Sequence, residues 1–262
     1  MSREELELAI SGNERRKNQR IQPEQKWIAV AGSEVVGLAL VGQHRTGTLQ
    51  PTGRGIVRFL GYKRGLRRAG QMLHDAIDNY ARDNEIKTLT AFPFLRSLPN
   101  PSLSNHLGHI QGLLTACGYT HSQGHVRLEW RHFTAEPIPS TCPLEFRIET
   151  EPTDGDLPAL RVTSYLKGNE VGVCYSRPHP TSESRASEGP WLVVYDLDIV
   201  ESEQGNGFGW LTLQKGLAEA STHGYRSAVI GCNENNGRAL SMYANVGFKA
   251  IDWSYDFNRD LS

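Results

Sequence analysis

Apolar residues along the chain gather in short runs, separated by stretches in which they recur at helical spacing. In the first half the runs predict five strands, at residues 26–31, 35–41, 56–60, 87–92 and 125–130. The helical stretches predict a charged helix at 3–20 and two further helices at 71–82 and 107–116. The polar stretches 42–55 and 93–105 are expected to be loops.

The second half contains the same kinds of pattern. Its strands are predicted at residues 144–150, 160–167, 171–176, 191–200, 227–232 and 248–257. The second and third of these form a hairpin that turns at Gly168-Asn169. Apolar residues at intervals of three and four predict a helix that follows the glycines at 205–209 and ends at His223-Gly224.

The predicted elements therefore follow the same order in both halves: strands, a glycine turn into a helix, a strand, a short helix and a last strand. This order predicts a tandem duplication in an α/β (α+β) fold, with domains 1–135 and 144–262 joined by a proline-bearing linker at 136–143. Residues 1–135 hold 18 Lys+Arg against 11 Asp+Glu, and residues 136–262 hold 10 against 18. Such an asymmetry favours different roles for the two halves.

The composition narrows the class of protein. An apolar fraction of 38% and a net charge of −1 are ordinary for a globular protein and indicate no bulk electrostatic partner. The four cysteines are scattered, and the N-terminus lacks the basic and apolar segments of a signal peptide. We therefore expect a cytoplasmic protein with no membrane partner. The nine histidines form no ligand-spaced group, so no metal is expected either.

The stretch Gln204-Gly205-Asn206-Gly207-Phe208-Gly209 carries the clearest chemical signal. It lies between a predicted strand and the start of a predicted helix, where backbone N–H groups and the helix dipole favour an anion such as diphosphate. A dinucleotide fingerprint would need a third glycine at Trp210, and a Walker loop would need Gly-Lys-Ser/Thr at its end. Neither motif is present.

The pattern Gln-x-x-Gly-x-Gly resembles the acetyl-CoA loop of the GNAT superfamily of acyltransferases. A second GNAT signature, Asn-x-x-Ala-x-x-x-Tyr-x-x-x-Gly-Phe, is matched without a gap by Asn236, Ala239, Tyr243, Gly247 and Phe248. The resemblance is strong over residues 191–257. With the repeat, it implies two tandem GNAT-type domains, each a mixed, mainly antiparallel twisted sheet flanked by helices, a plan similar to that of mycothiol synthase.

The resemblance implies an acetyl-CoA-dependent N-acetyltransferase in which a primary amine of a small molecule or peptide attacks directly in a ternary complex. Tyr243 would then be the general acid for the departing thiolate. The main chain at Ile199 and Val200, beside a bulge, would polarise the thioester carbonyl. The residues that would bind acetyl-CoA are Ile199, Val200, Gln204, Gly205, Asn206, Gly207, Phe208, Gly209 and Asn236.

The general base is not readable from the sequence. Tyr195, Asp198 and Glu201 are candidates for a base or a proton relay through water, while strict alternation sets Asp196 and Asp198 on the strand face opposite Val193 and Tyr195. The acidic surplus of the second half favours a cationic acceptor. The two helices that normally cover the acceptor side of a GNAT domain are missing, because only about nine residues, 151–159, are available. The acceptor site is then either open or completed by the first half or by a second subunit, as in a homodimer.

The first half departs from the family pattern. It has Leu114 at the tyrosine position and Met72 at the position of the second loop glycine, so we expect a non-catalytic domain. Two other functions stay open: a CoA-binding regulatory or scaffold protein, and an aminoacyl transferase that uses charged tRNA. The second would bind RNA through the basic cluster at residues 63–68, although nucleic acid is disfavoured because only Tyr62 accompanies these charges.

Overall fold

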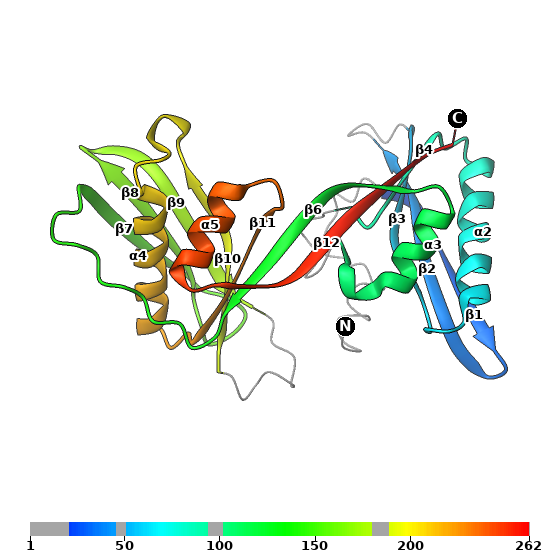
Figure 1. Ribbon diagram of the computed structural model, residues 1–262, viewed down its shortest axis with the longest axis horizontal. Helices are drawn as coiled ribbons and strands as arrows, with labels where there is room; N and C mark the ends of the chain where they lie inside the picture. The colour runs from blue at the N-terminus through cyan, green and yellow to red at the C-terminus, as the bar shows by residue number, and fades with distance from the viewer. Residues whose placement is uncertain (1–20, 46–50, 94–101, 180–188, 262) are drawn as a thin grey trace. The chain divides into compact units, whose positions relative to one another are not determined.

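The computed structural model describes residues 21–45, 51–93, 102–179 and 189–261 (Figure 1). The chain divides into two compact units, Met1–His125 with Asp252–Ser262, and Val126–Ile251. The predicted helix at 3–20 and most of the predicted loop at 93–105 lie outside the described residues. Each unit contains a mixed sheet flanked by helices, which confirms the predicted fold class.

The first unit is organised around an antiparallel meander that continues into a parallel pair. Its elements are β1 (Ile21–Ala31), β2 (Glu34–Arg45), β3 (Pro51–Tyr62), α2 (Arg67–Asp83), β4 (Thr88–Ala91), β5 (Leu103–Ser104), η1 (Asn105–Leu107), α3 (Gly108–Ala116) and the start of β6 (Thr120–Trp130). Strand β4 pairs with β3 in parallel over four residues, which end at Val57 opposite Ala91. Beyond this point, as far as Tyr62, no strand among the described residues pairs with β3 on that side.

Residues 42–55 form strand on both sides of positions 46–50, so the expectation of a continuous loop there was wrong. Their polar and glycine residues resemble a loop in composition, but ladder pairing fixes them in the sheet, as between Gln43 and Gly55. Glycine at position 55 leaves room for the Leu89 side chain, which a Cβ would approach to 2.7 Å. Tertiary contact here overrides local propensity.

Helix α2 covers the meander and supplies much of the first core. Leu73 and Ile77 point into a cluster with Leu60 and Leu89 of the sheet, all at most 3% exposed. The helix begins at Arg67, four residues before the predicted start, so Gly70 is a helical residue and not part of the preceding loop. A Cβ on Gly70 would lie 2.5 Å from the ring of Tyr62, which explains a glycine inside this helix.

The second unit repeats the plan. Its elements are the end of β6, then β7 (Leu144–Glu151), β8 (Ala159–Leu166), β9 (Asn169–Pro178), β10 (Trp191–Ile199), η3 (Glu201–Glu203), α4 (Phe208–Thr222), β11 (Ser227–Asn233), α5 (Gly237–Val246) and the start of β12 (Lys249–Asp260). No helix lies between β7 and β8, as predicted. The β8–β9 turn is centred on Lys167-Gly168, both at positive φ, one residue before the predicted Gly168-Asn169.

Strand β10 contains a bulge that the alternation rule missed. Val193 pairs with Arg177 and Val194 with Ser176, but Asp196 pairs with Tyr175, so Tyr195 is an extra residue. A bulge of this kind shifts the facing of every later side chain. By this register Asp196 and Asp198 share a face with Val193, which corrects the expectation that they lie on the opposite one.

Strand β12 gives the largest departure from the predicted domain boundaries. Its last residues pair with β4 of the first unit, from Phe257 opposite Ala91 to Asp260 opposite Thr88. Arg259 also donates to Asp78 of α2 at 2.7 Å. The segment Asp252–Ser262 is therefore counted with the first unit, whereas the predicted second domain extended to residue 262.

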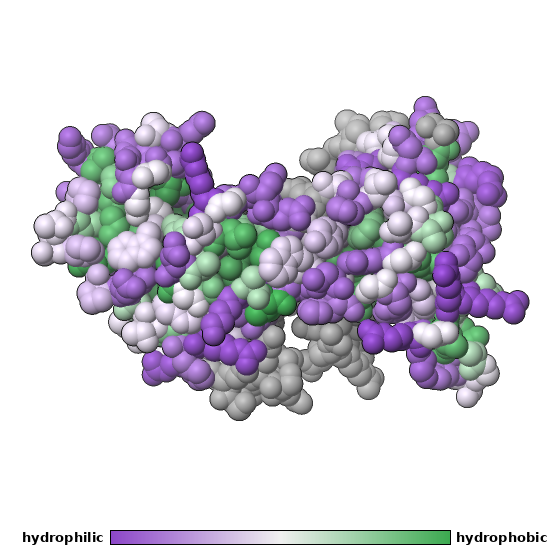
Figure 2. All heavy atoms as spheres, in the orientation of Figure 1, coloured by the Kyte–Doolittle hydropathy of each residue, from purple (hydrophilic) through white to green (hydrophobic). Residues whose placement is uncertain are grey.

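Among the described residues, no helix is long and apolar enough to cross a membrane. The face drawn in Figure 2 carries hydrophilic residues over both units, with apolar residues in smaller patches between them.

Candidate active site

The loop between β10 and α4 is held in a conformation that only glycine adopts without strain. Gly205 and Gly207 have φ of +87° and +80°, and Gly207 is the residue that precedes the helix. A Cβ at either position would meet no atom within 4 Å. The space beside this loop is therefore open, and glycine is needed there for backbone conformation and not to relieve internal crowding.

The backbone of this loop offers a row of hydrogen-bond donors. Within the described part of the chain, no N–H group of residues 205–210 donates to a backbone carbonyl, and the first bond of the helix runs from Leu211 to the carbonyl of Gly207 at 3.1 Å. No side chain caps the start of α4. Six consecutive N–H groups at a helix N-terminus form an arrangement suited to a large oxyanion.

The polar side chains of the loop are used to shape it. Gln204 donates from Nε2 to the carbonyl of Ile199 at 2.9 Å, which ties the loop to the end of β10. Asn206 donates from Nδ2 to the carbonyl and to Oε2 of Glu203, both at 3.3 Å. The loop's backbone donors are thus left for a ligand, while part of the hydrogen-bonding capacity of these two amides is used within the chain.

Earlier on the strand that leads to this loop, β10 and β11 pair in parallel for only three residues, ending at Val193 opposite Val229. The bulge at Tyr195 follows directly on β10. Helix α5 approaches the same region, because the Sδ atom of Met242 would lie 3.4 Å from a Cβ on Gly209. The loop and α5 thus lie close together, in the same unit as the strands whose parallel pairing ends early.

Tyr243 of α5 is 5% exposed. Burial raises the pKa of its phenol above the ordinary value, and Cys232, Cys174 and Asp196 act in the same direction. These groups come from β11, β9 and β10, so the phenol lies where the two parallel strands part. In the described part of the chain its hydroxyl has no hydrogen-bond partner. At neutral pH such a phenol keeps its proton and can donate it.

Three residues predicted to touch a cofactor have structural roles here. Asn236 caps α5, since its Oδ1 accepts from the N–H of Ala239 at 3.1 Å. The N–H of Val200 donates to the carbonyl of Val171 at 2.9 Å, and the carbonyl of Ile199 accepts from Gln204. The bulge expected beside Ile199 and Val200 lies instead at Tyr195, four residues earlier.

The second unit matches a known family. Residues 127–248 match the model of the Acetyltransferase (GNAT) family. Residues 127–248 belong to the GNAT family. Comparison with curated proteins gives no match. Both GNAT signatures predicted from the sequence fall inside the matched GNAT domain, and its family supports an acyltransferase activity.

Solved structures show that the whole chain has the tandem GNAT fold. A tandem GNAT protein from the clavulanic acid biosynthesis pathway is 16% identical, with a TM-score of 0.68 over 97% of this chain and 88% of that one. A GCN5-related N-acetyltransferase from Sphaerobacter thermophilus is 14% identical, with a TM-score of 0.59 over 90% and 80%. A GCN5-related glucosamine N-acetyltransferase region of a fungal multi-domain β-N-acetylglucosaminidase is 12% identical, with a TM-score of 0.66 over 98% and 34%.

The candidate bases of the GNAT domain lie on or just after β10. Tyr195 is 37% exposed, and the guanidinium carbon of Arg177 lies 4.1 Å from its ring centroid. Asp198 is exposed, and Glu201 is exposed in the 3-10 turn η3. Sequence reasoning did not select Asp196, which is exposed and shares the face of Asp198. The alternation of a regular strand could not have predicted the face on which Asp196 lies, because the bulge changes the facing of every later residue.

At the corresponding helix start in the first unit, side chains of the chain itself pack against each other. The hydroxyl of Tyr62 donates to the carbonyl of His109 at 2.7 Å, and the two rings meet edge to face at 5.1 Å. A cavity of about 260 Å³ remains beside them, lined by Tyr62, Gly65, Arg67, Gly108, His109 and Gly112. In the basic cluster, Lys63 pairs with Glu34 at 2.9 Å.

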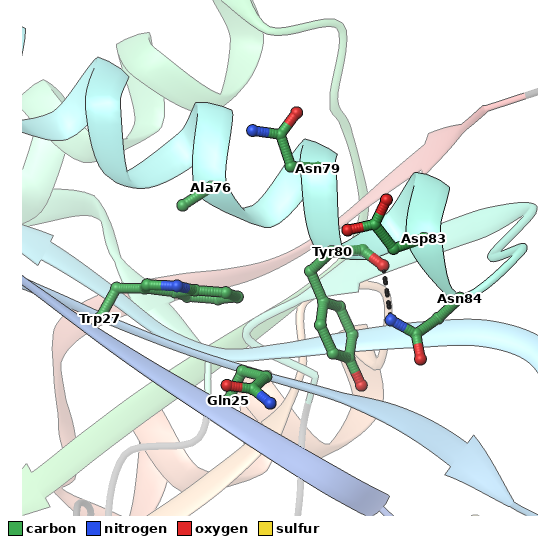
Figure 3. Close-up of a pocket in the computed structure, with 7 residues that line it drawn as sticks. All are labelled: Gln25, Trp27, Ala76, Asn79, Tyr80, Asp83 and Asn84. Carbon is green, nitrogen blue, oxygen red and sulfur yellow. Dashed lines mark hydrogen bonds between the residues drawn. The ribbon is translucent and has the colours of Figure 1, made fainter.

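A larger cavity in the first unit has no link to these features. It measures about 390 Å³ and lies between β1 and α2, where Trp27 and Tyr80 meet at 6.0 Å (Figure 3). Figure 3 shows the side chain of Asn84 reaching back to the carbonyl of Tyr80, a 2.8 Å bond that closes the helix end. The lining is neutral and amide-rich apart from Asp83. Elsewhere, the described residues contain no group of three or more metal-ligating side chains.

Proposed function

We propose that this protein is an acetyl-CoA-dependent N-acetyltransferase and that its GNAT domain, residues 127–248, carries the activity. The acceptor is a primary amine of a small molecule or peptide. The observation that carries the proposal is the row of six backbone N–H groups at the start of α4, in a domain of the GNAT family.

The residues of this loop fit the diphosphate of acetyl-CoA. Its oxygens need several donors at once, and open space beside Gly205 and Gly207 allows backbone to approach them closely. The positive end of the α4 dipole adds to the attraction. When bound there, acetyl-CoA supplies an acetyl group activated as a thioester. The side chains of Gln204 and Asn206 hold the loop in the shape that presents the donors.

Tyr243 would hold the proton for the departing sulphur. Its raised pKa keeps the phenol neutral at physiological pH, so the proton is present when the thiolate forms. General acid assistance of this kind contributes roughly 10² to 10⁴ in rate. The position of the phenol, near Cys232 of β11 and Asp196 of β10, supports this assignment because the parallel strands part between those residues.

The acceptor arrives as an ammonium ion and must lose a proton before its nitrogen can attack. Asp196 and Asp198 are carboxylates on one face of β10, directly after the bulge, and they are exposed. Either could accept this proton, directly or through water, with Tyr195 and Glu201 as the other candidates. The open carboxylates also favour a cationic group at this place.

The test compares Tyr243→Phe with Tyr225→Phe in the full chain. Tyr225 is a second buried tyrosine of the same unit, and its hydroxyl already donates to the carbonyl of Pro158 at 2.8 Å. We expect Tyr243→Phe to lower the rate of CoA release from acetyl-CoA with an amine panel by about a hundredfold or more, with CoA affinity by calorimetry retained.

Tyr225→Phe should keep its turnover, because that tyrosine lies outside the proposed site. Failure of the unaltered protein to bind CoA, or to acetylate any amine while binding it, would reject the proposed activity. The second result would favour the CoA-binding scaffold instead.

A further inference from the structure

One face of the second sheet carries a row of arginines stacked on tyrosines. It is the face opposite α4, because Ser164 and Cys174 on the other face contact Thr212 and Gly216 of that helix. The guanidinium of Arg161 lies 5.1 Å from the ring centroid of Tyr175, and that of Arg177 lies 4.1 Å from the centroid of Tyr195. The two tyrosine rings meet edge to face at 6.5 Å.

Stacking fixes the plane of a guanidinium while leaving its N–H edge available. Within the described part of the chain, neither Arg161 nor Arg177 has an ion-pair partner. By contrast Arg147, on the outer strand β7, donates to Glu149 at 2.8 Å. Arg177 is thus oriented without being neutralised, whereas Arg161 lies directly opposite Glu149 of β7 in the strand register.

The same face carries negative charge on the neighbouring strand. Asp196 lies opposite Tyr175, and Asp198 follows two residues later. Asp196 is two steps of the β9 register from Arg177, which is about 7 Å along the strands and one strand spacing across. Neither aspartate forms an ion pair among the described residues. Opposite charges are therefore displayed side by side on this face and do not neutralise each other.

This arrangement lies where the proposed reaction would take place. Arg177 is directly opposite Val193, the last residue of β10 that pairs with β11, and the bulge begins two residues later. An amine bound here would lie near the carboxylates of Asp196 and Asp198. A second group of the same molecule, about one strand spacing away, would lie near the N–H edge of Arg177.

We propose that the acceptor is an amine that also carries an oxyanion, either a carboxylate or a phosphate, which Arg177 binds while its guanidinium stacks on Tyr195. Arg161, stacked on Tyr175, extends this anion-binding row. The inference rests on the proposed acetyl transfer and names the substrate class of the same site. Charge-assisted bonds from a guanidinium edge recognise either oxyanion well, so the two sources must be separated by experiment.

The experiment uses two matched pairs of probes with the full chain. L-Lysine and cadaverine differ by one carboxylate, and glucosamine 6-phosphate and glucosamine differ by one phosphate. We expect the unaltered protein to prefer the anionic member of at least one pair by about tenfold or more in kcat/KM. The pair that shows the preference identifies the oxyanion. Calorimetric titration of the same probes into the CoA-loaded protein should show the same order of affinity, which gives a readout independent of turnover.

The variant Arg177→Gln should reduce that preference by about tenfold, and Arg177→Lys by less, because lysine keeps the charge but loses the planar edge. Arg147→Gln is the matched control and should leave the preference as it is, since Arg147 is already paired with Glu149. No preference in either pair, or a preference that Arg177→Gln leaves unchanged, would overturn this inference. CoA binding without acetylation of any probe or other amine would instead reject the proposed activity, and the calorimetric preference would still decide the role of Arg177.

Discussion

The two units start a helix at the same point of their fold but treat the backbone there differently. In the second unit, six consecutive N–H groups before Leu211 have no backbone acceptor in the described part of the chain. In the first unit, Leu66 donates to the carbonyl of Lys63 at 3.0 Å, and Ala69 donates to that of Leu66 at 2.9 Å. The second unit thus leaves its backbone N–H donors available to a ligand. In the first unit, some of these donors are bonded to carbonyls of the same turn.

The space beside each loop differs as well. Where β3 and β4 cease to pair, the first unit places Tyr62 against His109, and the Tyr62 ring also contacts Gly70. In the second unit, the position that corresponds to Leu114 of the first holds Tyr243, whose hydroxyl has no partner among the described residues. Common topology thus gives two candidate sites. In the first, Tyr62 and His109 pack together beside a cavity of about 260 Å³, and in the second the start of α4 keeps N–H groups without a backbone acceptor among the described residues.

The largest expected effect is on stability and comes from a substitution in β12. It tests whether this strand stabilises the first unit and not the second. Phe257 of β12 is 3% exposed in the core of the first unit. Replacing it with alanine should cost about 3–5 kcal/mol of stability, because a buried ring is lost and a cavity remains. Hydrogen exchange should show lost protection in α2 and β4 and little change in α4. Loss of protection confined to α4 would contradict the assignment of this strand to the first unit.

That strand also shows what a sequence can and cannot reveal. Alternation at Ile251, Trp253, Tyr255 and Phe257 predicts a strand correctly, but periodicity does not say which sheet the strand joins. Pairing with β4 depends on contacts between residues more than 160 positions apart, such as Asn258 with Thr90. The strand was therefore predictable and its partner was not.

The candidate site divides in the same way. Glycines at positive φ and the second GNAT motif are local features, so the loop and Tyr243 could be predicted by position. The bulge at Tyr195 has no local marker and moved Asp196 and Asp198 to the other face. The side-chain bonds of Gln204 and Asn236 also depend on the folded backbone, and the sequence alone assigned both residues to cofactor binding. Those assignments stay predictions, since each amide has further hydrogen-bonding capacity.

A smaller effect compares the glycine in the first turn of each main helix. An alanine Cβ at Gly70 would lie 2.5 Å from the Tyr62 ring, whereas at Gly209 it would lie 3.4 Å from the flexible end of Met242. Gly70→Ala should therefore lower stability by about 1–3 kcal/mol through overpacking. Gly209→Ala should change it by less than about 1 kcal/mol. Chemical denaturation of both variants measures the difference, and equal losses would show that the Tyr62 ring can move away at little cost.

The smallest expected effect is on the free energy of CoA binding. It tests most directly whether the loop of the second unit, and not that of the first, binds the diphosphate. Gly65 and Gly207 have φ of +89° and +80°, and a Cβ on either would meet nothing within 4 Å. An aspartate at each site therefore introduces the same charge with similar backbone strain, which asparagine and aspartate tolerate better than most residues. Only at Gly207 does the new carboxylate stand beside the row of N–H groups proposed to bind the diphosphate.

Gly207→Asp should weaken CoA binding about tenfold, or 1.4 kcal/mol, while Gly65→Asp should leave it unchanged. Calorimetry with CoA measures both, and an equal loss for the two variants would mean that the first unit binds the cofactor as well, despite the Tyr62–His109 contact.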